Sequence, residues 1–176
     1  MKVLAFAASG SQNSINHQLL QYVASIMTAD EVELLRLSDY ELPLFTAERE
    51  LELGQPELAK QLFEKIGHAD AVIISFAEYN GSYSAFYKNT FDWLSRIDRG
   101  VFQNKAMVLL SASPGPGGAK TVLNSALKSM PHFSADVKAS LSIGKFTQVF
   151  DAHSQSIVDP EVNAQLLSAL AQLSNG

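Results

Sequence analysis

Four stretches of the chain are predicted to be strands, at residues 2–8, 31–37, 70–76 and 105–112. Residues 3–8 and 71–74 are continuous apolar runs, which is the pattern of parallel strands buried on both faces of a sheet. Apolar and polar residues alternate over 137–150, which predicts one or two further short strands. The chain should therefore contain at least five strands.

The segments between these strands repeat apolar residues at helical spacing. The predicted inner faces are formed by Ile15, Leu19, Leu20, Val23, Ile26 and Met27; by Leu58, Leu62 and Ile66; by Phe86, Phe91 and Leu94; by Val122, Ala126, Leu127 and Met130; and by Leu166, Leu170 and Leu173. Pro56 and the Asp159-Pro160-Glu161 triplet mark two helix starts. Residues 38–54 are expected to be irregular and to lie near the rim of a site.

Alternating strands and helices imply a parallel sheet with right-handed crossovers and helices on both faces. Four strand–helix units followed by a last strand and helix predict a doubly wound, five-stranded parallel α/β fold with the flavodoxin-like order 2-1-3-4-5. A chain of 176 residues fits one such domain, spanning 1–176, and contains no repeat, linker or low-complexity segment.

Composition narrows the possible functions. The net charge is −5 and Lys and Arg form no cluster, so a nucleic-acid partner is not expected. The chain has no cysteine, and its four histidines are scattered without metal-ligand spacing, so we expect no metal site. The first apolar run, about six residues, is shorter than the ~7–15 of a signal sequence. No run approaches the ~20 residues of a membrane span, so we expect a cytoplasmic protein that does not cross a membrane.

The loop after the first strand is rich in small polar residues. Ser9, Ser11, Ser14 and Asn16 crowd the start of a helix, next to Ile15. Free backbone N–H groups and the positive end of the helix dipole make such a position an anion site. Simple helix capping by Ser14 explains the same residues, so both interpretations stay open.

The loop after the third strand contains Tyr79, Asn80 and Gly81. In open α/β sheets, ligands bind at the carboxyl ends of the strands, where this loop lies. Asn and Gly tolerate positive φ, and Tyr79 offers a flat surface to an aromatic ring. A connection that merely turns the chain is the alternative.

The loop after the fourth strand, residues 113–118, holds three glycines and two prolines. Glycine lets the backbone approach a planar ligand closely, and its N–H groups could bond ring oxygens. The alternative is a tight strand-to-helix turn. The chain contains no G-x-G-x-x-G, P-loop or G-x-S-x-G pattern, so a Rossmann dinucleotide site, a P-loop and a serine nucleophile are not supported.

Residues 75–96, SFAEYNGSYSAFYKNTFDWLSR, resemble the PEYNGS-x-PG-x-LKN-x-x-DWLSR signature of the NADPH-dependent FMN reductase family. The matching positions are Glu78, Tyr79, Asn80, Gly81, Ser82, Lys88, Asn89, Asp92, Trp93, Leu94, Ser95 and Arg96. The chain departs from the signature at Ala77 (family Pro), Ser84-Ala85 (family Pro-Gly) and Tyr87 (family Leu).

The other two loops resemble the same family. The first is similar to its GS-x-R-x-x-S-x-N phosphate loop at Ser9, Ser14 and Asn16, but Ser11 replaces the family's Arg and Ala8 its first Gly. The third is similar to its S-x-PG-x-GG loop, and the matching positions are Ser111, Ser113, Gly115, Gly117 and Gly118. Losing the Arg removes a bidentate phosphate partner.

The resemblance implies an FMN-containing oxidoreductase that takes hydride from NADPH or NADH and passes electrons to a small acceptor such as a quinone or a flavin. The flavin carries the chemistry, so no catalytic side chain is assigned. The residues expected to bind FMN are Ser9, Ser11, Ser14, Ile15, Asn16, Ala77, Glu78, Tyr79, Asn80, Gly81, Ser113, Gly115, Gly117 and Gly118. A homodimer or homotetramer with the site near a subunit interface is also implied.

Two other hypotheses stay open. The protein could be a flavodoxin-like electron carrier without NAD(P)H turnover, although a net charge of −5 is modest for that role. It could also be a relative whose phosphate loop, lacking Arg, has lost the flavin.

Overall fold

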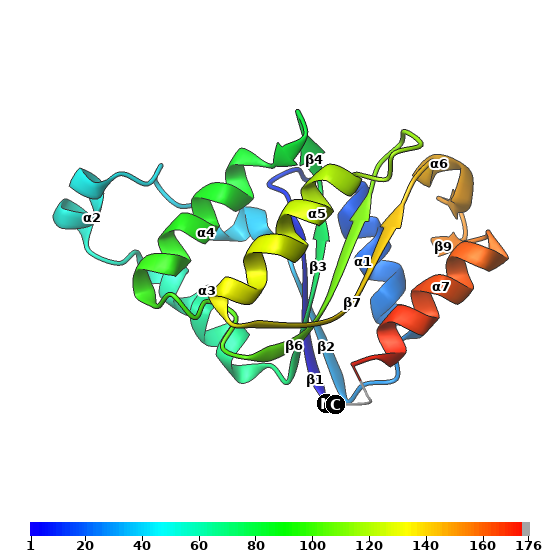
Figure 1. Cartoon of the computed structure of the whole chain (residues 1–176), viewed down its shortest axis with the longest axis horizontal. Coiled ribbons are helices and arrows are strands. Elements are labelled where there is room, and N and C mark those ends of the chain that lie inside the picture. The colour runs from blue at the N-terminus through cyan, green and yellow to red at the C-terminus, as the bar shows by residue number, and fades with distance from the viewer. Residues whose placement is uncertain (174–176) are drawn as a thin grey trace.

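The protein is built around a five-stranded parallel sheet with the order β2-β1-β3-β6-β7 (Figure 1). This computed structural model describes residues 1–173. The strands are β1 (Lys2–Ala8), β2 (Glu31–Leu35), β3 (Ala71–Phe76), β6 (Lys105–Ala112) and β7 (Ala135–Ile143). Because β6 and β7 are the fourth and fifth strands of this sheet in chain order, the predicted order 2-1-3-4-5 is confirmed.

Helices cover both faces of the sheet (Figure 1). They are α1 (Ile15–Ile26), α3 (Glu57–His68), α4 (Ala85–Ile97), α5 (Lys120–Ser129) and α7 (Pro160–Ala171). Helices α3, α4 and α5 pack on one face, and α1 and α7 pack on the other. The start predicted for α7 is confirmed, since Asp159 accepts hydrogen bonds from the N–H groups of Glu161 and Val162.

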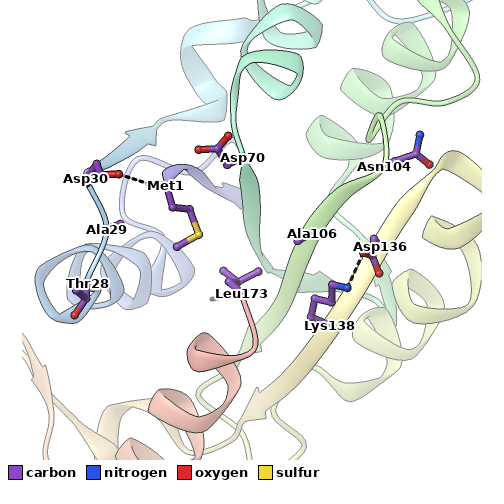
Figure 2. A pocket seen from close by; sticks show the side chains of 10 residues that line it. All are labelled: Met1, Thr28, Ala29, Asp30, Asp70, Asn104, Ala106, Asp136, Lys138 and Leu173. Carbon is purple, nitrogen blue, oxygen red and sulfur yellow. Dashed lines mark hydrogen bonds and ion pairs between the residues drawn. The ribbon is translucent and has the colours of Figure 1, made fainter. Parts of the chain in front are cut away.

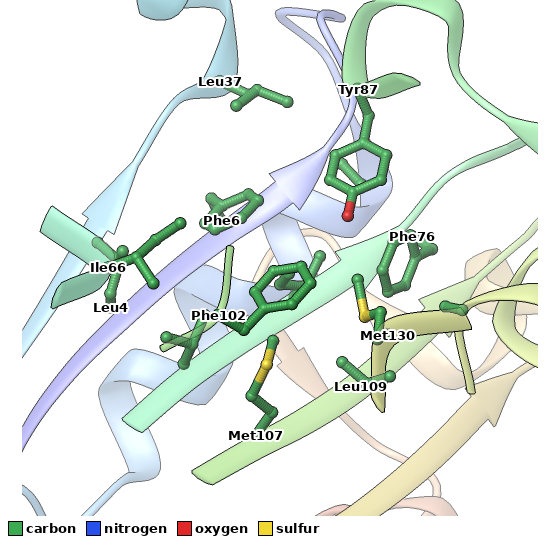
Figure 3. Close-up of a cluster of buried hydrophobic side chains, with 14 of the residues drawn as sticks. Leu4, Phe6, Leu37, Ile66, Phe76, Tyr87, Phe102, Met107, Leu109 and Met130 are labelled. Carbon is green, nitrogen blue, oxygen red and sulfur yellow. The ribbon is translucent and has the colours of Figure 1, made fainter. Parts of the chain in front are cut away.

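Alternate residues of each central strand enter two separate cores. In β1, Leu4 and Phe6 join the cluster under α3, α4 and α5 (Figure 3), while Val3 and Ala5 join the cluster under α1 and α7. Burial of both faces explains why these strands read as continuous apolar runs. Strand β7 lies at the sheet edge and is less buried, which explains its alternating sequence.

Several boundaries differ from the sequence prediction. The second strand ends at Leu35, and the segment expected to be irregular contains a 3-10 helix, η1 (Leu37–Tyr40), and a short helix, α2 (Ala47–Leu53). The alternating stretch 137–150 was predicted to form one or two strands, and its first part, up to Ile143, belongs to one strand, β7, while its last part lies in a short helix and a two-residue strand. The remaining short elements are η2 (Met130–Phe133), α6 (Phe146–Val149), β8 (Phe150–Asp151), β9 (Ser156–Ile157) and an unpredicted hairpin of β4 (Glu78–Tyr79) and β5 (Ser82–Tyr83).

Helix α2 and its flanking chain form an arm that stands out from the body of the molecule (Figure 1). Side chains of α4 hold its base. Asn89 donates from Nδ2 to the carbonyl of Leu42 at 3.1 Å and accepts the N–H of Phe45 at 2.8 Å. The indole N–H of Trp93 donates to the carbonyl of Pro43 at 2.7 Å. These bonds come from residues far away in the sequence, so local pattern could not reveal them.

Candidate functional site

The carboxyl ends of β1, β3 and β6 bring the three polar loops to one edge of the sheet. A cavity of about 250 Å³ lies between them. Its lining residues are Ser11, Asn13, Ser14, Ile15, Asn16, Ala77, Glu78, Tyr79, Ala112, Ser113 and Pro114. A second cavity, about 330 Å³, is lined by Ser9, Gly10, Ser11, Tyr79, Ser84, Ala85 and Phe86. Ser11 and Tyr79 line both cavities, so the two form one site.

The first loop caps helix α1 and also presents backbone N–H groups that have no acceptor among the described residues. Ser9 Oγ accepts the N–H of Ser11 at 3.1 Å, and Ser14 Oγ accepts the N–H of His17 at 3.4 Å. The predicted capping by Ser14 is therefore observed. Within residues 1–173, the backbone N–H groups of 12–16 donate to no protein acceptor. These groups sit at the positive end of α1, so an anion can still bind there.

Asn16 fastens this loop to two strands rather than reaching into the cavity for a ligand. It is buried, with 2% of its surface exposed. Its Oδ1 accepts from Ser75 Oγ at 2.7 Å and from the N–H of Ala112 at 3.0 Å, and its Nδ2 donates to the carbonyl of Ala112 at 3.3 Å. Its side chain thus positions the loops, and its backbone N–H is the group left for a ligand.

The second loop is a β-hairpin. Asn80 and Gly81 have φ values of 52° and 72°, as the two central residues of a type I′ turn require. Tyr79, beside this turn, is 51% exposed and stands where the two cavities meet. Asn80 and Gly81 line neither cavity. Their observed role is to turn the chain, and contact with FMN stays a prediction for them.

Glu78 anchors the hairpin to α5. Helix α5 begins after Ala119, which has no side-chain cap to offer, and Glu78 Oε2 accepts the N–H of Val122 at 2.9 Å. A carboxylate at a helix N-terminus also interacts favourably with the helix dipole. The carboxylate of Glu78 is therefore committed to holding the loop, even though the residue lines the cavity.

The glycine loop after β6 holds two kinds of glycine. Gly118 has a φ of 63°, and a Cβ there would collide with Ser142 Oγ and lie 2.9 Å from the N–H nitrogen of Gly144. Its carbonyl accepts from Ser111 Oγ at 2.6 Å and from Ser142 Oγ at 2.8 Å. Packing against β7 therefore requires glycine at position 118, and contact with FMN stays a prediction for this residue. Gly115 and Gly117 face open space.

Sequence reasoning missed the wall of the second cavity. Ser84 Oγ donates to the carbonyl of Ala8 at 2.9 Å and accepts the N–H of Tyr87 at 3.1 Å, so it caps α4 and ties it to β1. Gly10 faces Phe86, whose ring would meet any Cβ at that position. The available signal was the Ser84-Ala85 departure, which marks this wall, but the neighbours of Gly10 come from the fold alone.

Another cavity, about 630 Å³, lies at the opposite end of the sheet, beside the amino ends of the strands (Figure 2). The charged groups that line this cavity form ion pairs or hydrogen bonds with other groups of the protein. The terminal ammonium pairs with Asp30, Lys138 with Asp136 at 2.8 Å, and Asp70 accepts the N–H of Lys2 at 2.7 Å. We therefore place the functional site at the carboxyl edge, where donors remain open.

Within residues 1–173, no helix combines the length and apolar character needed to cross a membrane. No group of three or more acidic or histidine side chains in the same range is arranged to hold a metal ion.

The residues at the carboxyl edge fit FMN. The unpaired N–H groups of residues 12–16 suit a phosphate ester, which needs several donors and favours a helix start. Tyr79 gives a flat, exposed surface, and the N–H groups of Gly115 and Gly117 donate to no acceptor within residues 1–173. Such donors match the oxygen-rich edge of an isoalloxazine ring.

Comparison with known proteins agrees with this geometry. The family model described as NADPH-dependent FMN reductase matches residues 1–148. A quinone reductase of Escherichia coli (strain K12) is 33% identical over 122 residues, which are 68% of this chain and 64% of that protein. The chain thus spans just under two thirds of that relative's length. An NADPH:quinone oxidoreductase of Arabidopsis thaliana is 28% identical, covering 98% of this chain and 90% of that protein.

Among solved structures, the flavoenzyme NAD(P)H:(acceptor) oxidoreductase FerB from Paracoccus denitrificans is similar with a TM-score of 0.77. The two are 21% identical, and the alignment covers 99% of this chain and 97% of the other. This likeness confirms the fold.

Proposed function

The chain belongs to the NADPH-dependent FMN reductase family, and from this premise we propose that it is an FMN-containing oxidoreductase that uses NADPH or NADH to reduce a small acceptor such as a quinone or a flavin. The observation that carries the proposal is the single site formed by the three loops, with open N–H donors at one end and the exposed ring of Tyr79 in the middle. Bound FMN would supply the redox chemistry, accepting hydride from nicotinamide and reducing the acceptor.

The protein's own residues bind and orient the flavin. The unpaired N–H groups of residues 12–16 would hold the phosphate, and Tyr79 would support the ring system. The N–H groups of Gly115 and Gly117 would donate to ring oxygens and stabilise negative charge there. Behind them, Asn16, Glu78 and the pair Ser111 and Ser142 keep the three loops in place through the hydrogen bonds described above.

The reaction is tested by anaerobic reduction and by kinetics. The purified protein should be yellow and should bleach when NADPH or NADH is added without oxygen. Because one open site must serve donor and acceptor in turn, steady-state rates with a quinone should follow ping-pong kinetics, with parallel double-reciprocal lines. Flavin that dithionite reduces but neither nicotinamide reduces would point instead to an electron carrier. A colourless protein that binds no added flavin would overturn the proposal altogether.

The proposal extends to a homodimer or homotetramer in the cytoplasm. The arm carries three exposed leucines, Leu44 (67% exposed), Leu51 (89%) and Leu53 (53%). Its base is held by hydrogen bonds from α4, so these leucines are kept at the surface, where they can contact a second copy. Helix α2 buries none of its residues within the chain. A projection that is held at its base and has an apolar surface is suited to pack against a second copy.

Leu51→Glu is expected to weaken self-association by ~10-fold or more, because it places a charge in an apolar contact. Size-exclusion chromatography with light scattering, across a range of concentrations, measures the shift to monomer. Leu167→Glu is the matched control, since Leu167 is also an exposed helix leucine (45%) but lies on α7. An unchanged oligomer in the Leu51 variant would contradict the role of the arm.

A further inference from the structure

The loop proposed to bind phosphate carries no charge of its own. Residues 9–16, SGSQNSIN, contain no Lys, Arg or His. Its donors are neutral N–H and O–H groups, while a phosphate ester is nearly a dianion at neutral pH. Charge-assisted hydrogen bonds are roughly twice as strong as neutral ones, so a cation near this loop would strongly change its affinity for phosphate.

Such a cation comes from the neighbouring strand. Leu35, the last residue of β2, pairs with Phe6 of β1, so Arg36 follows at the same edge of the sheet as the loop. Arg36 Nη1 donates to the carbonyl of Gln12 at 3.2 Å. Within residues 1–173, Arg36 is the one Lys or Arg whose side chain donates a hydrogen bond to this loop.

Much of the donor capacity of Arg36 is still open. A guanidinium has five N–H donors, and one of them is used on Gln12. No carboxylate forms an ion pair with Arg36 in the described part of the chain, whereas Arg96 is paired with Glu50 at 2.9 Å. The charge of Arg36 is therefore not neutralised locally.

The field of Arg36 reaches the first turn of α1. The pKa of His17 lies below its ordinary value, first because the ring is buried and second because of the positive charge of Arg36. His17 is the residue whose N–H is capped by Ser14, so this field acts at the helix start. The helix dipole has the same sign at this point, and the two add.

We propose that Arg36 binds the phosphate ester of FMN and supplies the positive charge that residues 9–16 lack. This inference rests on the FMN site proposed above. Arg36 thus takes the place of an arginine within the loop itself, reaching the same anion from the end of β2.

The test is a set of titrations with full-length protein freed of flavin. Arg36→Gln should weaken FMN binding ~10- to 100-fold, the range expected for losing a hydrogen bond to a charged group. Binding of riboflavin, which has the same ring but no phosphate, should hardly change. Added KCl should weaken FMN binding more steeply in the wild type than in Arg36→Gln, because salt screens a charge but does not alter the shape of the loop.

Arg49→Gln is the matched control, since Arg49 also donates from Nη1 to a backbone carbonyl, that of Leu44 at 2.7 Å, but lies on the arm. It should leave both flavin affinities unchanged. Parallel losses for FMN and riboflavin, or no loss for either, would overturn the inference. So would a variant in which only the KM for NADPH rises relative to NADH, since Arg36 would then serve the phosphate of the nicotinamide nucleotide. Wild-type protein that binds neither flavin would instead refute the proposed function.

Discussion

Ser14→Asp is expected to lower the affinity for FMN at least ~100-fold while leaving riboflavin binding nearly unchanged. Ser14 caps α1 and lines the cavity beside the open N–H groups of the loop. Aspartate is also a good cap and suits the helix dipole, so α1 should keep its stability. Two like unit charges about 4 Å apart repel by roughly 4 kcal/mol at an effective dielectric of ~20, and a phosphate is nearly a dianion.

Ser14→Asn is the control for this experiment, because it keeps a capping side chain of similar size without the charge. Fluorescence titrations of the three proteins with FMN and riboflavin, together with thermal melts, separate binding from folding. If Ser14→Asp and the wild type bind FMN equally well, the loop is a helix cap and the phosphate must bind elsewhere.

Gly118→Val is expected to destabilise the fold by roughly 2–5 kcal/mol. A β-branched residue at a φ of 63° is strained, and its side chain would be forced into Ser142 and the backbone of Gly144. For a domain of this size, the loss corresponds to a decrease in Tm of roughly 5–20 °C. Thermal or urea unfolding without flavin measures it directly.

Gly115→Val is the matched control for this substitution. Gly115 lies in the same loop, and no atom is close to the position of its Cβ, so folding should be almost unaffected. FMN affinity of the Gly115 variant then tests whether this stretch approaches the flavin ring. A Gly118 variant that melts like the wild type but binds FMN poorly would support the ligand contact predicted for Gly118 and contradict the packing role.

The sheet could be predicted because each central strand feeds two cores. Val3, Leu4, Ala5 and Phe6 are all buried, so the strand appears in the sequence as a continuous apolar run, a pattern that the polar loops of this chain lack. The arm gave no such signal. It depends on Asn89 and Trp93 bonding backbone groups more than 40 positions away in the chain, and local pattern does not register such contacts.

The sequence predicted which three loops form the site, but not the hydrogen bonds that connect these loops to one another and to the sheet. Ser14 and Tyr79 lie on the cavity as their sequence context suggested. Asn16 and Glu78 also line it, but their side chains are engaged in holding protein groups. A polar side chain at a strand end has the same sequence signature whether it binds a ligand or a neighbouring loop. Only the three-dimensional structure separates the two roles.

The hydrogen bonds of the Asn16 side chain affect the thermodynamics of flavin binding. One amide ties the start of α1 to Ser75 of β3 and to Ala112 of β6, so the first and third loops are joined before any ligand arrives. The entropy of fixing them relative to each other is lost on folding, not on binding. The favourable free energy of the contacts with the flavin therefore contributes almost fully to the affinity, because little of it is needed to order the two loops on binding.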